Sequence, residues 1–142
     1  LALAYCLNAI SRELGTANFV VSMTKAWMTP TLLLVFTFLV CAFISFFTGT
    51  SWGTYAIVTP IVIPLAFELT AGAVTNLVFA TIGAVMGGGC FGDHCSPLSD
   101  TTILSSLAAG SDHIDHVKTQ LPYAFAAAGV SAVLYVVLGF IL

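Results

Sequence analysis

Residues 87–102 of the chain read GGGCFGDHCSPLSDTT, a stretch that interrupts an otherwise apolar sequence. Its three adjacent glycines lower helix propensity. Pro97 lacks a backbone donor, and the residue before a proline is biased toward extended geometry. We therefore predict that a helix breaks within this stretch. A second, short helix is expected to begin at Ser99 or Asp100, either of which is a suitable N-cap, and to end near residue 109.

The sequence on both sides of this stretch is that of a membrane protein. Of the 142 residues, 59% are hydrophobic and 6% are charged, and the mean hydropathy is +1.08. Residues 26–67, 69–92 and 119–142 form runs of 42, 24 and 24 residues without Asp, Glu, Lys or Arg. About 20 apolar residues cross a bilayer core. The composition predicts an all-α integral membrane protein and excludes a soluble domain, a disordered chain and a nucleic-acid binder, which needs a basic face.

The longest charge-free run contains a turn. As one helix its 42 residues would extend about 63 Å, roughly twice the thickness of the hydrocarbon core. Residues 48–54, TGTSWGT, hold two glycines and four hydroxyl residues in seven positions, which is typical of a turn. The arm after it, residues 55–67, would be only about 20 Å long. We therefore predict a re-entrant hairpin over residues 31–67, with its tip inside the membrane and covered by protein or a cavity.

The remaining segments complete a single transmembrane domain over residues 1–142. An interfacial helix is expected over residues 17–27, because Lys25 and Trp27 suit the headgroup region. A broken helix is expected over residues 72–109 and a spanning helix over residues 120–142, after a polar loop. Both ends of the chain lie within apolar patterns and no signal peptide is visible, so we expect a piece of a longer protein.

Two interrupted helices rich in glycine and hydroxyl residues indicate a transporter binding site. Unwound backbone offers carbonyl oxygens, which together with hydroxyls suit a small hard cation. Asp93 and Asp100 are the carboxylates within the predicted break, and an ionisable group in a membrane marks an ion or proton path. Asp100 could instead merely cap a helix. Two close carboxylates away from water would share a proton, which a bound cation would expel, and this competition amounts to cation/proton exchange.

These arguments define two sets of candidate residues. The candidate ion- and proton-binding residues are Asp93, Asp100, His94, Thr50, Ser51, Ser96, Ser99, Thr101 and Thr102. The residues expected to permit backbone breaks are Gly49, Gly53, Gly87, Gly88, Gly89 and Pro97. His94 could tune or carry the proton, or be a hydrogen-bonded structural histidine. We expect no cofactor, and no metal beyond the transported cation.

Three segments resemble the NhaC-type sodium/proton antiporter family: residues 49–54 (GTSWGT), 92–106 (GDHCSPLSDTTILSS) and 112–123 (DHIDHVKTQLPY). The resemblance implies an ion-transporter-superfamily fold, in which two inverted-topology repeats each contribute a re-entrant hairpin and a discontinuous helix. It implies that this chain is the second repeat, that the first repeat is missing, and that the protein is a homodimer. Some members of the family exchange organic acids, such as malate for lactate.

Taken together, the sequence predicts a secondary active transporter, not an enzyme. It would exchange sodium for protons as a multi-pass protein in the lipid bilayer of the cytoplasmic membrane. One alternative is an organic-anion exchanger on the same fold, with a substrate carboxylate at the half-helix N-terminus over residues 99–102. Others are an intramembrane metalloenzyme that uses His94, His113 and His116, and a channel whose filter is the tip at residues 48–54.

Overall fold

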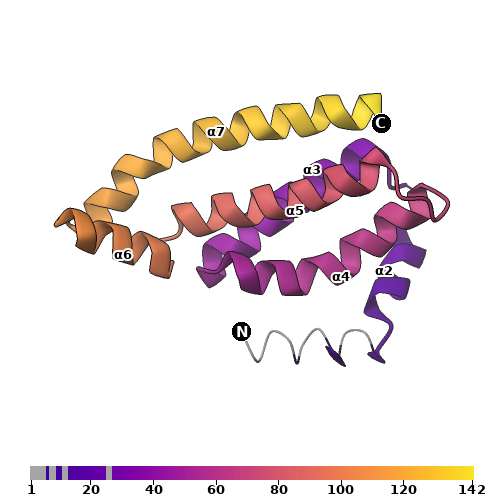
Figure 1. Cartoon of the computed structure of the whole chain (residues 1–142), viewed down its shortest axis with the longest axis horizontal. Coiled ribbons are helices and arrows are strands. Elements are labelled where there is room, and N and C mark those ends of the chain that lie inside the picture. Colours follow the sequence, from indigo (N-terminus) through magenta and orange to yellow (C-terminus); the bar gives the residue numbers. More distant parts are fainter. Residues whose placement is uncertain (1–5, 7–8, 11–12, 25–26) are drawn as a thin grey trace.

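The computed structural model describes residues 6, 9–10, 13–24 and 27–142 (Figure 1). Its helices are α2 (Thr16–Thr24), α3 (Pro30–Thr48), α4 (Ser51–Leu69), α5 (Asn76–Cys95), α6 (Asp100–Ala109) and α7 (His113–Ile141). No strand occurs among the described residues. The expected interfacial helix falls partly on α2, while Lys25 lies outside the described residues. That α2 lies along the membrane surface stays a prediction.

The long charge-free run folds as a helical hairpin, α3 and α4, joined at Gly49 and Thr50. Gly49 adopts the left-handed conformation, with φ of 65°, and caps α3. The Thr50 hydroxyl accepts a hydrogen bond from the backbone N–H of Gly53 at 3.4 Å. This cap starts α4 at Ser51, so the expectation that Gly53 breaks the backbone is wrong.

The two arms of the hairpin are equally long. Both α3 and α4 have 19 residues, or about 28 Å each. The expectation that the second arm is too short to cross is therefore wrong: α4 continues through Pro60 and Pro64, as transmembrane helices tolerate. That the tip lies inside the membrane stays a prediction, and it no longer rests on a short arm.

The glycine run does not break α5, contrary to expectation: Gly87, Gly88 and Gly89 are helical. The reason is contact with neighbouring helices: Gly87 lies against Tyr135 of α7, Gly89 against Tyr55 of α4, and Gly88 against α3, the helix on which α5 packs most extensively. A Cβ atom at Gly88 would collide with the Phe38 carbonyl oxygen and lie 2.9 Å from the Cβ atom of Cys41. Glycines at such positions let two membrane helices approach closely, and that packing outweighs their poor helix propensity.

The last helix, α7, begins at His113 and is longer than the expected segment 120–142. Asp112 is its N-cap, and the carboxylate accepts hydrogen bonds from the backbone N–H groups of Ile114 at 2.9 Å and Asp115 at 3.2 Å. This cap turns most of the expected polar loop into helix. In Figure 1, α7 runs along α3 and α5.

Two buried apolar clusters hold the hairpin to α5. One contains Leu33, Leu65, Ala66 and Val78, and the other contains Cys41, Val58 and Val85. Among the described residues, α3, α4 and α7 are long and apolar enough to cross a membrane. Their outward faces carry exposed large hydrophobic side chains such as Phe43 and Phe140, which suit contact with lipid. The chain is thus an all-α membrane protein.

Candidate functional site

The site is built around the turn between α5 and α6, residues 96–99. Ser96 and Ser99 both have extended backbone geometry, with ψ of 129° and 133°, and Pro97 lies between them. The break is therefore much shorter than the stretch 87–102 that the sequence indicated, because α5 continues through its glycines to Cys95.

Asp93 lies in the last turn of α5, and its side chain faces this turn. It is only 7% exposed. The hydroxyl of Ser99, which is fully buried, donates a hydrogen bond to Oδ1 of Asp93 at 2.8 Å. Because that hydroxyl has a single hydrogen, the neighbouring Thr101 hydroxyl, 2.8 Å away, is the donor to Ser99. The buried carboxylate at the C-terminal end of α5 thus accepts a hydrogen bond from Ser99, whose hydroxyl in turn accepts one from Thr101.

Other hydroxyl groups of the candidate set stabilise the turn. The Ser96 hydroxyl is fully buried and accepts a hydrogen bond from the Leu98 backbone N–H at 3.1 Å. The Thr102 hydroxyl, 4% exposed, donates to the His94 carbonyl at 3.3 Å and so ties α6 back to α5. These bonds satisfy backbone groups that the break leaves without helical partners.

The hairpin tip packs against the same turn. A Cβ atom at Gly49 would lie 2.7 Å from the carbonyl oxygen of Leu98 and 3.0 Å from the backbone nitrogen of Ser99. The tip and the break, which are distant in sequence, are therefore in contact. Thr50 and Ser51 follow Gly49 and are half-buried beside this contact.

The structure does not join the two predicted acids. Asp100 is in the first turn of α6 and is exposed. No hydrogen bond links it to Asp93 in the described chain. A proton shared between Asp93 and Asp100 therefore stays a prediction. Thr101 is exposed as well, although its hydroxyl reaches Ser99.

His94 points away from the turn into a groove between α5 and α7. Its Nδ1 lies 2.8 Å from the Cys90 carbonyl oxygen, an acceptor, so Nδ1 carries hydrogen and the neutral ring leaves Nε2 as its basic atom. The groove has a volume of about 500 Å³, and its polar lining includes His94, Gln120 and Tyr123. His94 is thus an exposed base, one residue from the buried carboxylate.

The sequence did not indicate the role of His113. Its Nε2 lies 2.8 Å from the Pro97 carbonyl oxygen, and its Nδ1 lies 3.2 Å from the Ser106 hydroxyl. One sequence pattern could have predicted that His113 lies on a helix. Asp112 is followed three residues later by Asp115, which is a helix-capping pattern. His116 contacts the Ser105 hydroxyl at 3.2 Å. In the described part of the chain no three His, Cys, Asp or Glu residues converge in a metal-binding arrangement.

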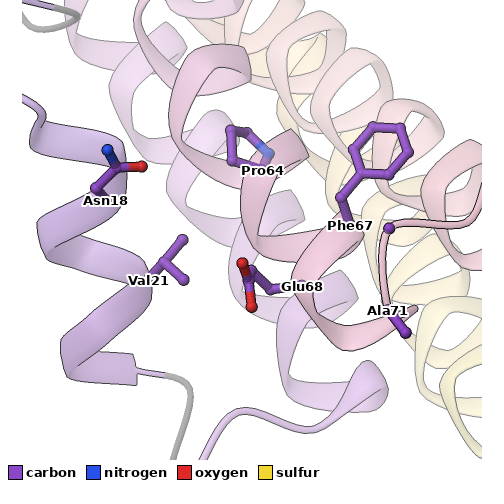
Figure 2. Close-up of a pocket in the computed structure, with 7 residues that line it drawn as sticks. Asn18, Val21, Pro64, Phe67, Glu68 and Ala71 are labelled. Atoms are coloured by element: carbon purple, nitrogen blue, oxygen red, sulfur yellow. The ribbon is translucent and has the colours of Figure 1, made fainter.

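A second pocket, of about 460 Å³, lies between α2 and the end of α4 (Figure 2). Asn18 and Val21 of α2 and Pro64, Phe67 and Glu68 of α4 line it. In Figure 1 this region is at the opposite end of the hairpin from α6. It shares no residue with the turn at residues 96–99, so it is separate from the candidate site.

Comparison with known proteins places the chain among transporters. The sequence profile of the Na+/H+ antiporter family matches residues 1–140. An uncharacterized protein of Haemophilus influenzae is 43% identical over 96% of this chain and 26% of its own length. The malate-2H(+)/Na(+)-lactate antiporter of Bacillus subtilis is 37% identical over 78% of this chain and 23% of its own.

The Na(+)/H(+) antiporter NhaC of Alkalihalophilus pseudofirmus is 30% identical over 98% of this chain and 29% of its own length. The chain thus spans about a quarter of the length of the curated relatives it matches. No solved structure matches it.

Proposed function

This chain belongs to the Na+/H+ antiporter family, and we propose that it carries the Asp93 half of a site at which sodium and protons compete. We propose that it is the second inverted repeat of a longer, multi-pass transporter of the cytoplasmic membrane, which acts as a homodimer. The coverage of about a quarter of each relative supports only that the complete transporter is longer than this chain. The first repeat would complete the site.

The observation that carries the proposal is the environment of the Asp93 carboxylate. It is buried, and the partner that the described chain offers it is a neutral hydroxyl, which balances no charge. A buried ionised carboxylate is costly unless a positive charge compensates it. Asp93 is therefore suited to hold either a metal cation or a proton, but not both together.

The atoms around Asp93 suit sodium. The carboxylate, the Ser99 and Thr101 hydroxyls and the backbone carbonyls at the end of α5 are hard oxygen donors. The C-terminal end of α5 adds a partial negative charge beside the carboxylate. We further propose that His94, whose basic Nε2 faces the open groove, passes protons between that groove and the site.

A second candidate is exchange of an organic acid together with sodium or protons. The observation in its favour is the identity of 37% to a protein named as a malate-2H(+)/Na(+)-lactate antiporter. The N-terminal end of α6, at Ser99 and Asp100, would then attract the substrate carboxylate. Uptake of radiolabelled malate or lactate, with and without a sodium gradient, distinguishes this candidate from sodium/proton exchange alone.

The test of the main proposal replaces Asp93 with Asn in the complete transporter that contains this chain. Sodium-dependent proton movement is followed with a pH-sensitive dye in everted membrane vesicles. We expect Asp93→Asn to abolish exchange and Asp93→Glu, which keeps a carboxylate, to retain part of it. The matched control is Asp115→Asn, because Asp115 is 73% exposed and its ion pair with Lys118 lies at the surface.

All variants are compared at equal amounts of protein in the membrane. If Asp93→Asn exchanges sodium for protons as well as the unmodified protein, Asp93 is not the exchangeable carboxylate and the proposal is wrong. If Asp93→Asn and Asp115→Asn reduce exchange equally, the effect is one of surface charge, and the proposal is wrong as well.

A further inference from the structure

We propose that His113 is a positioning residue of the ion site: it holds the turn at residues 96–99 so that the Ser99 hydroxyl reaches Asp93. This inference rests on the proposed role of Asp93. His113 is the first residue of α7, and it contacts both the turn and α6. It is therefore a link from the last helix to the site.

The contact with the turn has a defined proton arrangement. A carbonyl oxygen only accepts, so Nε2 of His113 is the atom that donates to Pro97 at 2.8 Å. Nδ1 lies 3.2 Å from the Ser106 hydroxyl, which is 1% exposed and donates its single hydrogen to the Ile103 carbonyl at 2.8 Å. The His113 ring thus joins the Pro97 carbonyl to α6.

The turn is held from two sides. Gly49 of the hairpin tip lies against the backbone of Leu98 and Ser99, and His113 binds the carbonyl of Pro97. Only Leu98 separates Pro97 from Ser99, whose hydroxyl lies 2.8 Å from the Asp93 carboxylate. Because the turn spans four residues, a displacement at Pro97 moves Ser99 directly. The inference is that loss of the His113 bond weakens sodium binding without removing any sodium ligand.

The experiment measures the half-saturating sodium concentration and the maximal exchange rate separately, in the complete transporter. We expect His113→Ala to raise the half-saturating concentration roughly five- to tenfold, the effect of about one lost hydrogen bond, with little change in maximal rate. His113→Gln, whose side-chain nitrogen reaches the place of Nε2, should restore most of the affinity. His113→Asn, which is too short to reach Pro97, should behave as Ala.

The matched control is His116→Ala, because His116 contacts the Ser105 hydroxyl and not the turn. It should leave both kinetic constants unchanged. A merely structural role for His113 predicts instead that His113→Ala lowers the amount of folded protein but not the sodium affinity, and that Gln and Asn behave alike. Either of these results overturns the inference.

A double variant tests the route of the effect. If His113 acts through Ser99, then Ser99→Ala combined with His113→Ala should bind sodium no more weakly than Ser99→Ala alone. If the two substitutions instead weaken sodium binding independently, so that their effects on affinity multiply, the inference is overturned.

Asp93→Asn is measured in the same series. If it abolishes exchange while His113→Ala has normal sodium affinity, the positioning role fails and the proposed function stands. If Asp93→Asn is fully active, the proposed function fails, and with it the role of His113.

Discussion

Ser99 is the N-cap residue of α6, but its hydroxyl donates to the Asp93 carboxylate at 2.8 Å and makes no capping hydrogen bond to its own helix. An N-cap serine ordinarily accepts from a backbone N–H of the first turn, and giving up that bond costs about 1 kcal/mol. The Ser99 side chain thus binds the carboxylate of α5 and does not cap α6, the helix that it begins. This arrangement is what we expect of a residue placed for binding.

Replacing Ser99 with Ala should therefore affect the site more than the fold. We expect the half-saturating sodium concentration to rise roughly three- to tenfold, because the carboxylate loses its hydroxyl donor. Ser22→Ala is the control, since Ser22 is exposed on α2 and its hydroxyl bonds only its own helix. Sodium titrations of exchange in vesicles measure both variants, and equal affinities would contradict the role of Ser99.

Gly49 and Gly110 allow a test of the contact between the hairpin tip and the turn. Both are helix C-caps with nearly the same geometry, φ of 65° and 63°, but a Cβ atom at Gly110 would meet nothing within 4 Å. Alanine at either position should cost about 1–2 kcal/mol of stability through its left-handed backbone. Only Gly49→Ala should also displace Leu98 and reduce exchange, which thermal unfolding and vesicle assays measure together.

The close packing of α3 on α5 leads to a prediction about stability. Gly88→Ala places a methyl group against the Phe38 carbonyl, so we expect a loss of about 2 kcal/mol or more and a lower unfolding temperature. Gly129, in α7, has open space around its Cβ position. Gly129→Ala should be neutral or stabilising by up to about 1 kcal/mol, through helix propensity. Equal effects at the two positions would argue against this packing.

The exposure of Asp100 distinguishes it from Asp93. Because Asp100 is exposed in the first turn of α6, replacing it with Asn removes mainly a favourable interaction with the helix dipole, about 0.3–1 kcal/mol. We expect exchange by Asp100→Asn to persist with at most a several-fold change in sodium affinity, unlike Asp93→Asn. Complete loss of exchange in Asp100→Asn would instead support the prediction from the sequence that Asp93 and Asp100 act as a pair.

Local chemistry made part of this structure predictable. The start of the short helix near Ser99, the turn at Gly49 and the membrane character were predictable from residue types and hydropathy within a few positions, although the Ser99 side chain makes no capping hydrogen bond. The helicity of the glycine run was not predictable in this way, because it depends on residues far away in the chain, such as Phe38 of α3, about 50 residues before Gly88. Helix propensity penalises these glycines, and only the packed partner shows why they are helical.

The candidate site, too, was predictable only where it depends on local sequence, and not where it depends on contacts between distant residues. Asp93 stood out as an acid within an apolar stretch, and the structure buries it. The function of His113 depends on a carbonyl 16 residues away that it meets only after α6 has turned the chain around. From the sequence alone, a histidine between two aspartates is expected in a solvent-exposed loop. Backbone acceptors such as Pro97 carry no side-chain signature at all.

The division of Asp93 and Ser99 between two helices has a thermodynamic consequence. An occupant that needs both groups at once binds only while α5 and α6 keep their mutual orientation, so occupancy and orientation are linked. By reciprocity, a change that tilts α6 away from α5 weakens the binding of such an occupant, and the occupant in turn holds α6 against α5. The four residues 96–99 thus set the helix orientation on which the binding of such an occupant depends.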